Sequence, residues 1–171
     1  DGVVHSEMPS ELFQKQGGTL HGFQLWVNLP ASDKRIPPKY QDIPSAQVPE
    51  IKPASNCEAR VLAGEFMGLK GVVETRVPVL YLHVKLTSGF LEVPIPDSWN
   101  AMAYVFNGSL VQENDKLHEG SLAVYGVEGD SVKLETDVSG CEVMLIAGKP
   151  LKEPVVRYGP FVMNTEEEIY T

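Results

Sequence analysis

The sequence has little cysteine, no cluster of basic residues and no long apolar run. Its two cysteines, Cys57 and Cys141, form no C-x-x-C pair, so the sequence does not indicate a disulfide framework or a cysteine-rich zinc site. Each stands at the start of an apolar alternating run, where a cysteine usually packs as a small buried hydrophobe. No stretch has the length of a bilayer span or the pattern of a signal peptide. We therefore expect a reducing compartment, the cytoplasm or the nucleus, and no contact with membrane.

Basic residues are outnumbered, since 14 Lys and Arg face 23 Asp and Glu for a net charge of −9. Direct nucleic-acid binding normally requires a basic stripe that displaces counterions from phosphates. The Lys and Arg residues are scattered, so no direct nucleic-acid binding is expected. An acidic surface instead favours solubility and contact with a basic protein partner. We expect a monomer.

Alternation of apolar and polar residues predicts short β-strands. In residues 23–29 (FQLWVNL), Phe, Leu, Val and Leu share one face, as in a half-buried strand. Residues 78–86 repeat this pattern, with His83 and Lys85 on the polar face. Further strands are expected at 131–138 and 141–147. Many short strands at this spacing are typical of an antiparallel sandwich or barrel, so the predicted class is all-β.

Asn107-Gly108 lies between the apolar residues 101–106 and 110–112. Both residues tolerate positive φ, which makes the pair a strong short-range signal for a hairpin turn. We therefore predict two strands joined by a turn at this point.

Proline marks a change of character between residues 36 and 53 and predicts an extended interdomain linker, because proline interrupts both helices and sheets. Residues 1–35 before it are too few to close a barrel. Residues 54–163 hold the other predicted strands, and Thr165-Glu166-Glu167-Glu168 is a capping box that predicts a helix start within 164–171. The strand-like residues 3–8 lack a lead-in and this helix begins close to Thr171, which is typical of a fragment.

One short segment suggests chemistry. Residues two apart in a strand point to the same side, so His5 and Glu7 would project together. An imidazole beside a carboxylate can fill two positions of an octahedral Fe(II), Mn(II) or Ni(II) site. The H-x-E spacing alone is weak evidence, because chance pairs are common. The sequence contains no Gly-rich phosphate loop, nucleophile elbow or calcium loop.

Several blocks of the sequence resemble the pirin family of double-cupin proteins. They are residues 2–9 (GVVHSEMP), 20–30 (LHGFQLWVNLP), 38–43 (PKYQDI), 145–154 (LIAGKPLKEP) and 158–165 (YGPFVMNT). The resemblance implies two cupin barrels: residues 1–35 as the remainder of an N-terminal metal-binding cupin and residues 54–163 as a metal-free C-terminal cupin. It also implies iron held by three His and one Glu, with His5 as the third His and Glu7 as the carboxylate.

The sequence departs from the family at one point, because it contains no H-x-H motif to supply the other two histidines. Those ligands are expected from a segment that this sequence does not contain, and two protein ligands rarely hold a divalent transition metal tightly. His21, His83 and His118 stand alone. We expect a hydrogen-bonding role for His21 and solvated side chains for the other two.

The resemblance leaves three functions open. The first is a quercetin 2,3-dioxygenase with Fe(II), in which His5 binds the metal and Glu7 is a ligand or catalytic base acting on a flavonol or similar small aromatic substrate. The second is an iron-dependent nuclear cofactor that contacts a transcription factor. The third is a metal-free cupin remnant with a scaffold role.

Overall fold

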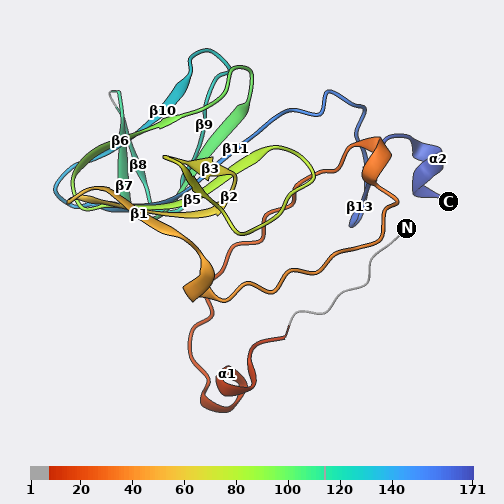
Figure 1. Cartoon of the computed structure of the whole chain (residues 1–171), viewed down its shortest axis with the longest axis horizontal. Helices are drawn as coiled ribbons and strands as arrows, with labels where there is room; N and C mark the ends of the chain where they lie inside the picture. Colours follow the sequence, from red (N-terminus) through yellow and green to blue (C-terminus); the bar gives the residue numbers. More distant parts are fainter. Residues whose placement is uncertain (1–7, 114) are drawn as a thin grey trace. The chain divides into compact units, whose positions relative to one another are not determined.

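The computed structural model describes residues 8–113 and 115–171 (Figure 1). Its residues form two compact units, one of Asp1–Lys39 with Lys152–Thr171 and one of Tyr40–Leu151. The domain limits predicted at residues 35, 53 and 163 stay predictions. No helix in the described part of the chain has the length and apolar character of a membrane span.

The unit Tyr40–Leu151 is built from strands, which confirms the predicted all-β class. It contains the 3₁₀ turn η2 (Ser45–Gln47) and eleven described strands: β1 (Glu50–Ala54), β2 (Cys57–Ala63), β3 (Glu65–Phe66), β4 (Leu69–Lys70), β5 (Val79–Leu86), β6 (Gly89–Pro94), β7 (Asn100–Gln112), β8 (Asp115–His118), β9 (Leu122–Val124), β10 (Ser131–Thr136) and β11 (Cys141–Gly148). The main sheet has the order β1-β2-β5-β11-β7-β10-β6, and β8 and β9 also pair with β7. The strands predicted within 78–86, 131–138 and 141–147 are therefore confirmed as β5, β10 and β11.

The core lies between the facing sides of these strands. Alternate residues of β5 point inward, and Leu82 and Val84 are fully buried. The same alternation on β2 and β11 buries Val61, Val143 and Leu145. Cys57 and Cys141 are buried free thiols, as predicted, and both are cross-strand neighbours of Leu86. The period-two pattern thus produces an apolar interior.

The hairpin predicted at Asn107-Gly108 is wrong, because β7 runs unbroken through both residues. Its pairing with β11 skips Phe106, which is the extra residue of a β-bulge, and Gly108 has φ of 72°. The first half of β7 pairs with β11 and β9, and the second half pairs with β8 and β10. The positive-φ glycine therefore accompanies a bend that lets one strand serve both parts of the sheet.

Strand β1 begins at Glu50, inside the proline-rich residues 36–53, and includes Pro53. Proline lacks an N–H donor and is tolerated on edge strands. Strand β1 is at the edge of the sheet, where it pairs only with β2 among the described strands. This position accommodates Pro53.

The other unit is made of short elements: α1 (Glu11–Gln16), the 3₁₀ turn η1 (Ala31–Asp33), β12 (Val156–Tyr158), β13 (Phe161–Met163) and α2 (Glu166–Ile169). The predicted helix start is confirmed by α2: Thr165 Oγ1 accepts a hydrogen bond from the Glu168 amide, and the Glu168 carboxylate accepts one from the Thr165 amide.

Residues 23–29 do not form the predicted strand. They are irregular, and Phe23, Trp26 and Val27 are exposed. A strand needs a neighbour for its backbone hydrogen bonds, and no strand in the described residues pairs with this segment. Side chains hold the region instead. Trp26 lies under the Arg157 guanidinium at 5.9 Å, and Lys34 Nζ donates to the Val162 carbonyl at 3.2 Å.

Candidate functional site

The predicted metal ligands His5 and Glu7 lie outside the described residues, so their placement stays a prediction. The chain is described from Met8 onward, where a short capped helix follows. Ser10 Oγ accepts from the Phe13 amide at 3.3 Å, and Gln14 Nε2 donates to the Pro9 carbonyl at 2.7 Å. These bonds fix the start of α1 directly after the H-x-E segment.

The remaining histidines are dispersed. The expectation that His83 is solvated is wrong: its side chain is 25% exposed and its Nε2 lies 3.1 Å from Glu142 Oε2 on the neighbouring strand β11. Its ring also lies 5.3 Å from the Phe106 ring. His118 is exposed on β8, as predicted, and His21 lies 5.4 Å from the ring of Phe23. The hydrogen-bonding role of His21 stays a prediction.

The interior of the Tyr40–Leu151 unit is lined by aliphatic side chains, the ring of Phe66 and two thiols. Burial raises the pKa of the Cys57 thiol to about 11, and burial also raises the pKa of Cys141. A protonated thiol is a poor metal ligand and a poor nucleophile. Across residues 8–113 and 115–171, no three His, Cys, Asp or Glu side chains are grouped so as to hold a metal ion.

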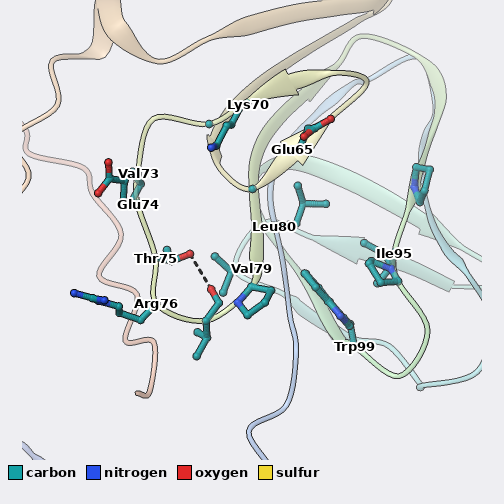
Figure 2. Close-up of a pocket in the computed structure, with 16 residues that line it drawn as sticks. Glu65, Lys70, Val73, Glu74, Thr75, Arg76, Val79, Leu80, Ile95 and Trp99 are labelled. Atoms are coloured by element: carbon teal, nitrogen blue, oxygen red, sulfur yellow. Dashed lines mark hydrogen bonds between the residues drawn. The ribbon is translucent and has the colours of Figure 1, made fainter. Parts of the chain in front are cut away.

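A pocket of about 920 Å³ opens at one end of this unit (Figure 2). Three parts of the chain form it: the β3–β4 hairpin, residues 71–80 and the β6–β7 connection. Val77, Leu80 and Ile95 are buried and supply an apolar wall. This volume lies within the usual range of small-molecule sites.

The wall formed by residues 71–78 is anchored along its length. The Val73 amide donates to the Leu62 carbonyl at 2.9 Å, and Thr75 Oγ1 donates to the Val77 carbonyl at 2.8 Å. The Gln41 side-chain amide pairs with both the N–H and the C=O of Glu74, each at 2.9 Å. These bonds fix the shape of the pocket without a ligand.

Trp99 closes the opposite side of the pocket. It follows a tight turn in which its amide donates to the Pro96 carbonyl at 3.2 Å, and Ser98 within that turn has φ of 62°. The left-handed conformation costs a non-glycine residue about 1–2 kcal/mol. The turn places the half-buried indole against the core while leaving it on the pocket surface.

The comparisons with known proteins agree on one family. Residues 81–171 match the model of the pirin C-terminal cupin domain. The chain belongs to the pirin family. It is 43% identical to pirin of Rattus norvegicus and 38% identical to pirin-like protein 2 of Arabidopsis thaliana, each over 98% of this chain and over 57% and 53% of those proteins.

A crystal structure of quercetin 2,3-dioxygenase from Acinetobacter baumannii is also similar, with a TM-score of 0.79 and 33% identity over 85% of this chain and 51% of that one. The predicted cupin fold is thereby confirmed. The chain spans about half the length of these relatives.

Sequence reasoning missed this pocket of the Tyr40–Leu151 unit. Its lining residues come from three separate turns and share no spacing that a motif search would detect. One signal was present: Trp99 directly follows the turn-forming run Pro94-Ile95-Pro96-Asp97-Ser98.

Proposed function

We propose that this chain supplies His5 and Glu7 to a non-haem iron centre of a quercetin 2,3-dioxygenase. The observation that carries the proposal is membership of the pirin family together with the H-x-E segment in the block GVVHSEMP. The 33% identity to the Acinetobacter baumannii quercetin 2,3-dioxygenase supports the substrate class, a flavonol.

The donor set fits such a centre in kind. One imidazole and one carboxylate are ligands that iron accepts, and two further histidines are expected from residues that this sequence does not contain. Bound iron supplies exchangeable coordination positions and redox chemistry. Glu7 has a second use, because a carboxylate beside the substrate accepts the proton of a flavonol hydroxyl as a general base.

The test begins with the intact mass of the protein purified from its native source, which shows whether residues flank Asp1 and Thr171. Elemental analysis then reports iron, and an oxygen electrode reports dioxygen uptake with quercetin. We expect about one iron per chain and turnover. His5→Ala should remove both, whereas His118→Ala, which changes an exposed histidine on β8, should alter neither.

Glu7→Gln separates the two roles of the carboxylate. If Glu7 acts mainly as the base, the variant keeps iron but loses turnover. If Glu7 is an essential ligand, the variant loses both. Circular dichroism of each variant confirms that the fold persists.

A second candidate function is an iron-dependent nuclear cofactor that binds a basic transcription factor, which the net charge of −9 favours through electrostatic steering. Iron-loaded protein without quercetin turnover would refute the dioxygenase and favour this cofactor. Less than about a tenth of an equivalent of iron would refute both and leave the scaffold role.

A further inference from the structure

We propose that the C-terminal cupin binds a small planar aromatic carboxylate in the pocket between the β3–β4 hairpin and Trp99. The pocket is lined by residues of Gly64–Trp99, whereas the proposed iron centre rests on the H-x-E segment of the sequence. Its occupant is inferred from the side chains that face the cavity.

The first indication is the aromatic wall. Trp99 offers an indole face beside the apolar side chains of Leu80 and Ile95, and Figure 2 shows these residues gathered on one side of the pocket. Flat aromatic rings pack well on such a surface, and an aromatic pair adds about 0.5–1.5 kcal/mol beyond area burial. The wall therefore favours a ligand with a flat apolar face over a free phosphate.

The second indication is a pair of unused donors. Among the described residues, neither Lys70 Nζ nor the Trp99 indole N–H has a hydrogen-bond or ion-pair partner. Figure 2 shows the Lys70 side chain directed along the 71–76 loop, toward the enclosed space. An ammonium group and an N–H donor at the edge of an apolar cavity are suited to a carboxylate.

The nearby acidic residues do not cancel this preference. Glu65 is the cross-strand partner of Lys70, but the two charged groups point to opposite sides of the hairpin in Figure 2. Glu74 and Arg76 point outward from their loop, away from Trp99. The charged lining residues comprise two carboxylates and two cations, and Lys70 is the one that Figure 2 shows directed into the enclosed space.

The pocket is also prebuilt. The hydrogen bonds of Val73, Thr75 and Gln41 fix one wall, and the turn at Ser98 fixes the other. A site that is already ordered loses less entropy when a ligand binds. Strained backbone such as Ser98 with positive φ is also found preferentially near functional sites.

The experiment uses 2-naphthoate as the probe, with the uncharged 2-naphthamide as its matched control, measured by isothermal titration calorimetry and saturation-transfer NMR on the whole protein. We expect 2-naphthoate to bind. Lys70→Gln should weaken its binding about ten-fold or more and leave 2-naphthamide unchanged, because a charged hydrogen bond is lost. Lys15→Gln removes the same charge from the exposed helix α1 and should change neither probe.

Trp99→Ala should weaken both probes about ten-fold, and Trp99→Phe, which keeps an aromatic face in the core, should retain most of the 2-naphthamide binding. Trp26→Ala, which changes the other tryptophan, should have no effect. The proposal is overturned if neither probe binds at millimolar concentration, or if Lys70→Gln and Trp99→Ala leave binding unchanged. It is also overturned if light scattering shows a dimer that Trp99→Ala dissociates, since a second copy would then occupy the pocket.

Discussion

Gly108 provides a quantitative test of how β7 bends. A Cβ built on Gly108 would lie 2.2 Å from the Gly140 carbonyl oxygen and 3.0 Å from Cys141 Cα. Ordinary C···O contacts are about 3.3–3.6 Å, so the two backbones would have to separate by about 1 Å. Strand β11 cannot move freely, because β5 holds its other edge.

The loss of unfolding free energy expected for Gly108→Ala has two contributions. An alanine at φ of 72° costs about 1–2 kcal/mol. Displacing Gly140 also breaks the 3.3 Å bond from the Ser109 amide to its carbonyl, and Ser109 is only 4% exposed. An unpaired buried amide costs about 1–3 kcal/mol, so we expect a total near 4 kcal/mol.

Gly120 is the matched control. Its φ is 86°, yet an added Cβ would meet nothing within 4 Å. Gly120→Ala should therefore lose only the conformational contribution, about 1–2 kcal/mol. Urea unfolding followed by circular dichroism gives both free energies of unfolding.

Asparagine separates strain from collision, because it tolerates the left-handed conformation but still carries a Cβ. Gly120→Asn should recover most of the stability lost in Gly120→Ala, whereas Gly108→Asn should stay as unstable as Gly108→Ala. The reasoning is refuted if the Gly108 and Gly120 alanine variants differ by less than about 0.5 kcal/mol, or if Gly108→Asn restores stability.

Two further predictions concern the core. Leu82→Ala removes a fully buried side chain and should lower the free energy of unfolding in urea by about 3 kcal/mol. Leu20→Ala, at a residue 73% exposed, should lower it by less than about 0.5 kcal/mol. Equal losses would contradict the assigned core. Because burial raises the pKa of Cys57 to about 11 and also raises that of Cys141, a disulfide reagent at about pH 8 should modify neither thiol in the native protein and both in concentrated guanidinium. Rapid native labelling would show that these thiols are accessible.

The parts of the fold that the sequence predicted are those set by local pattern. Strand β5 alternates so regularly that its buried face, which includes Leu82 and Val84, follows from the period of two. The start of α2 follows from Thr165 and Glu168, because a capping box depends only on neighbours in the chain. Such features need no knowledge of which strands lie side by side.

The errors arose where pairing decides the outcome. Asn107-Gly108 supplies positive φ, but a hairpin turn and a bulge both use it. The difference lies in β11, which pairs on both sides of Phe106 and keeps β7 extended. Before the bulge the buried side chains of β7 are at odd-numbered positions, the last of them Val105, whereas after it Leu110, at an even-numbered position, is buried. One extra residue in the strand produces this change. Residues 23–29 show the converse case, a strand pattern that has no paired neighbour in the described chain.

The two candidate sites also differ in whether the sequence pattern alone can suggest them. His5 and Glu7 suggest a metal centre because a strand brings residues two apart to one side, which a single sequence reveals. Lys70 and Trp99 come together only because the β3–β4 hairpin and the β6–β7 turn open at the same end of the unit. Their cooperation depends on topology, so only a structure can suggest it. The substitutions at Lys70 and at His5 therefore test independent conclusions, and either can fail while the other holds.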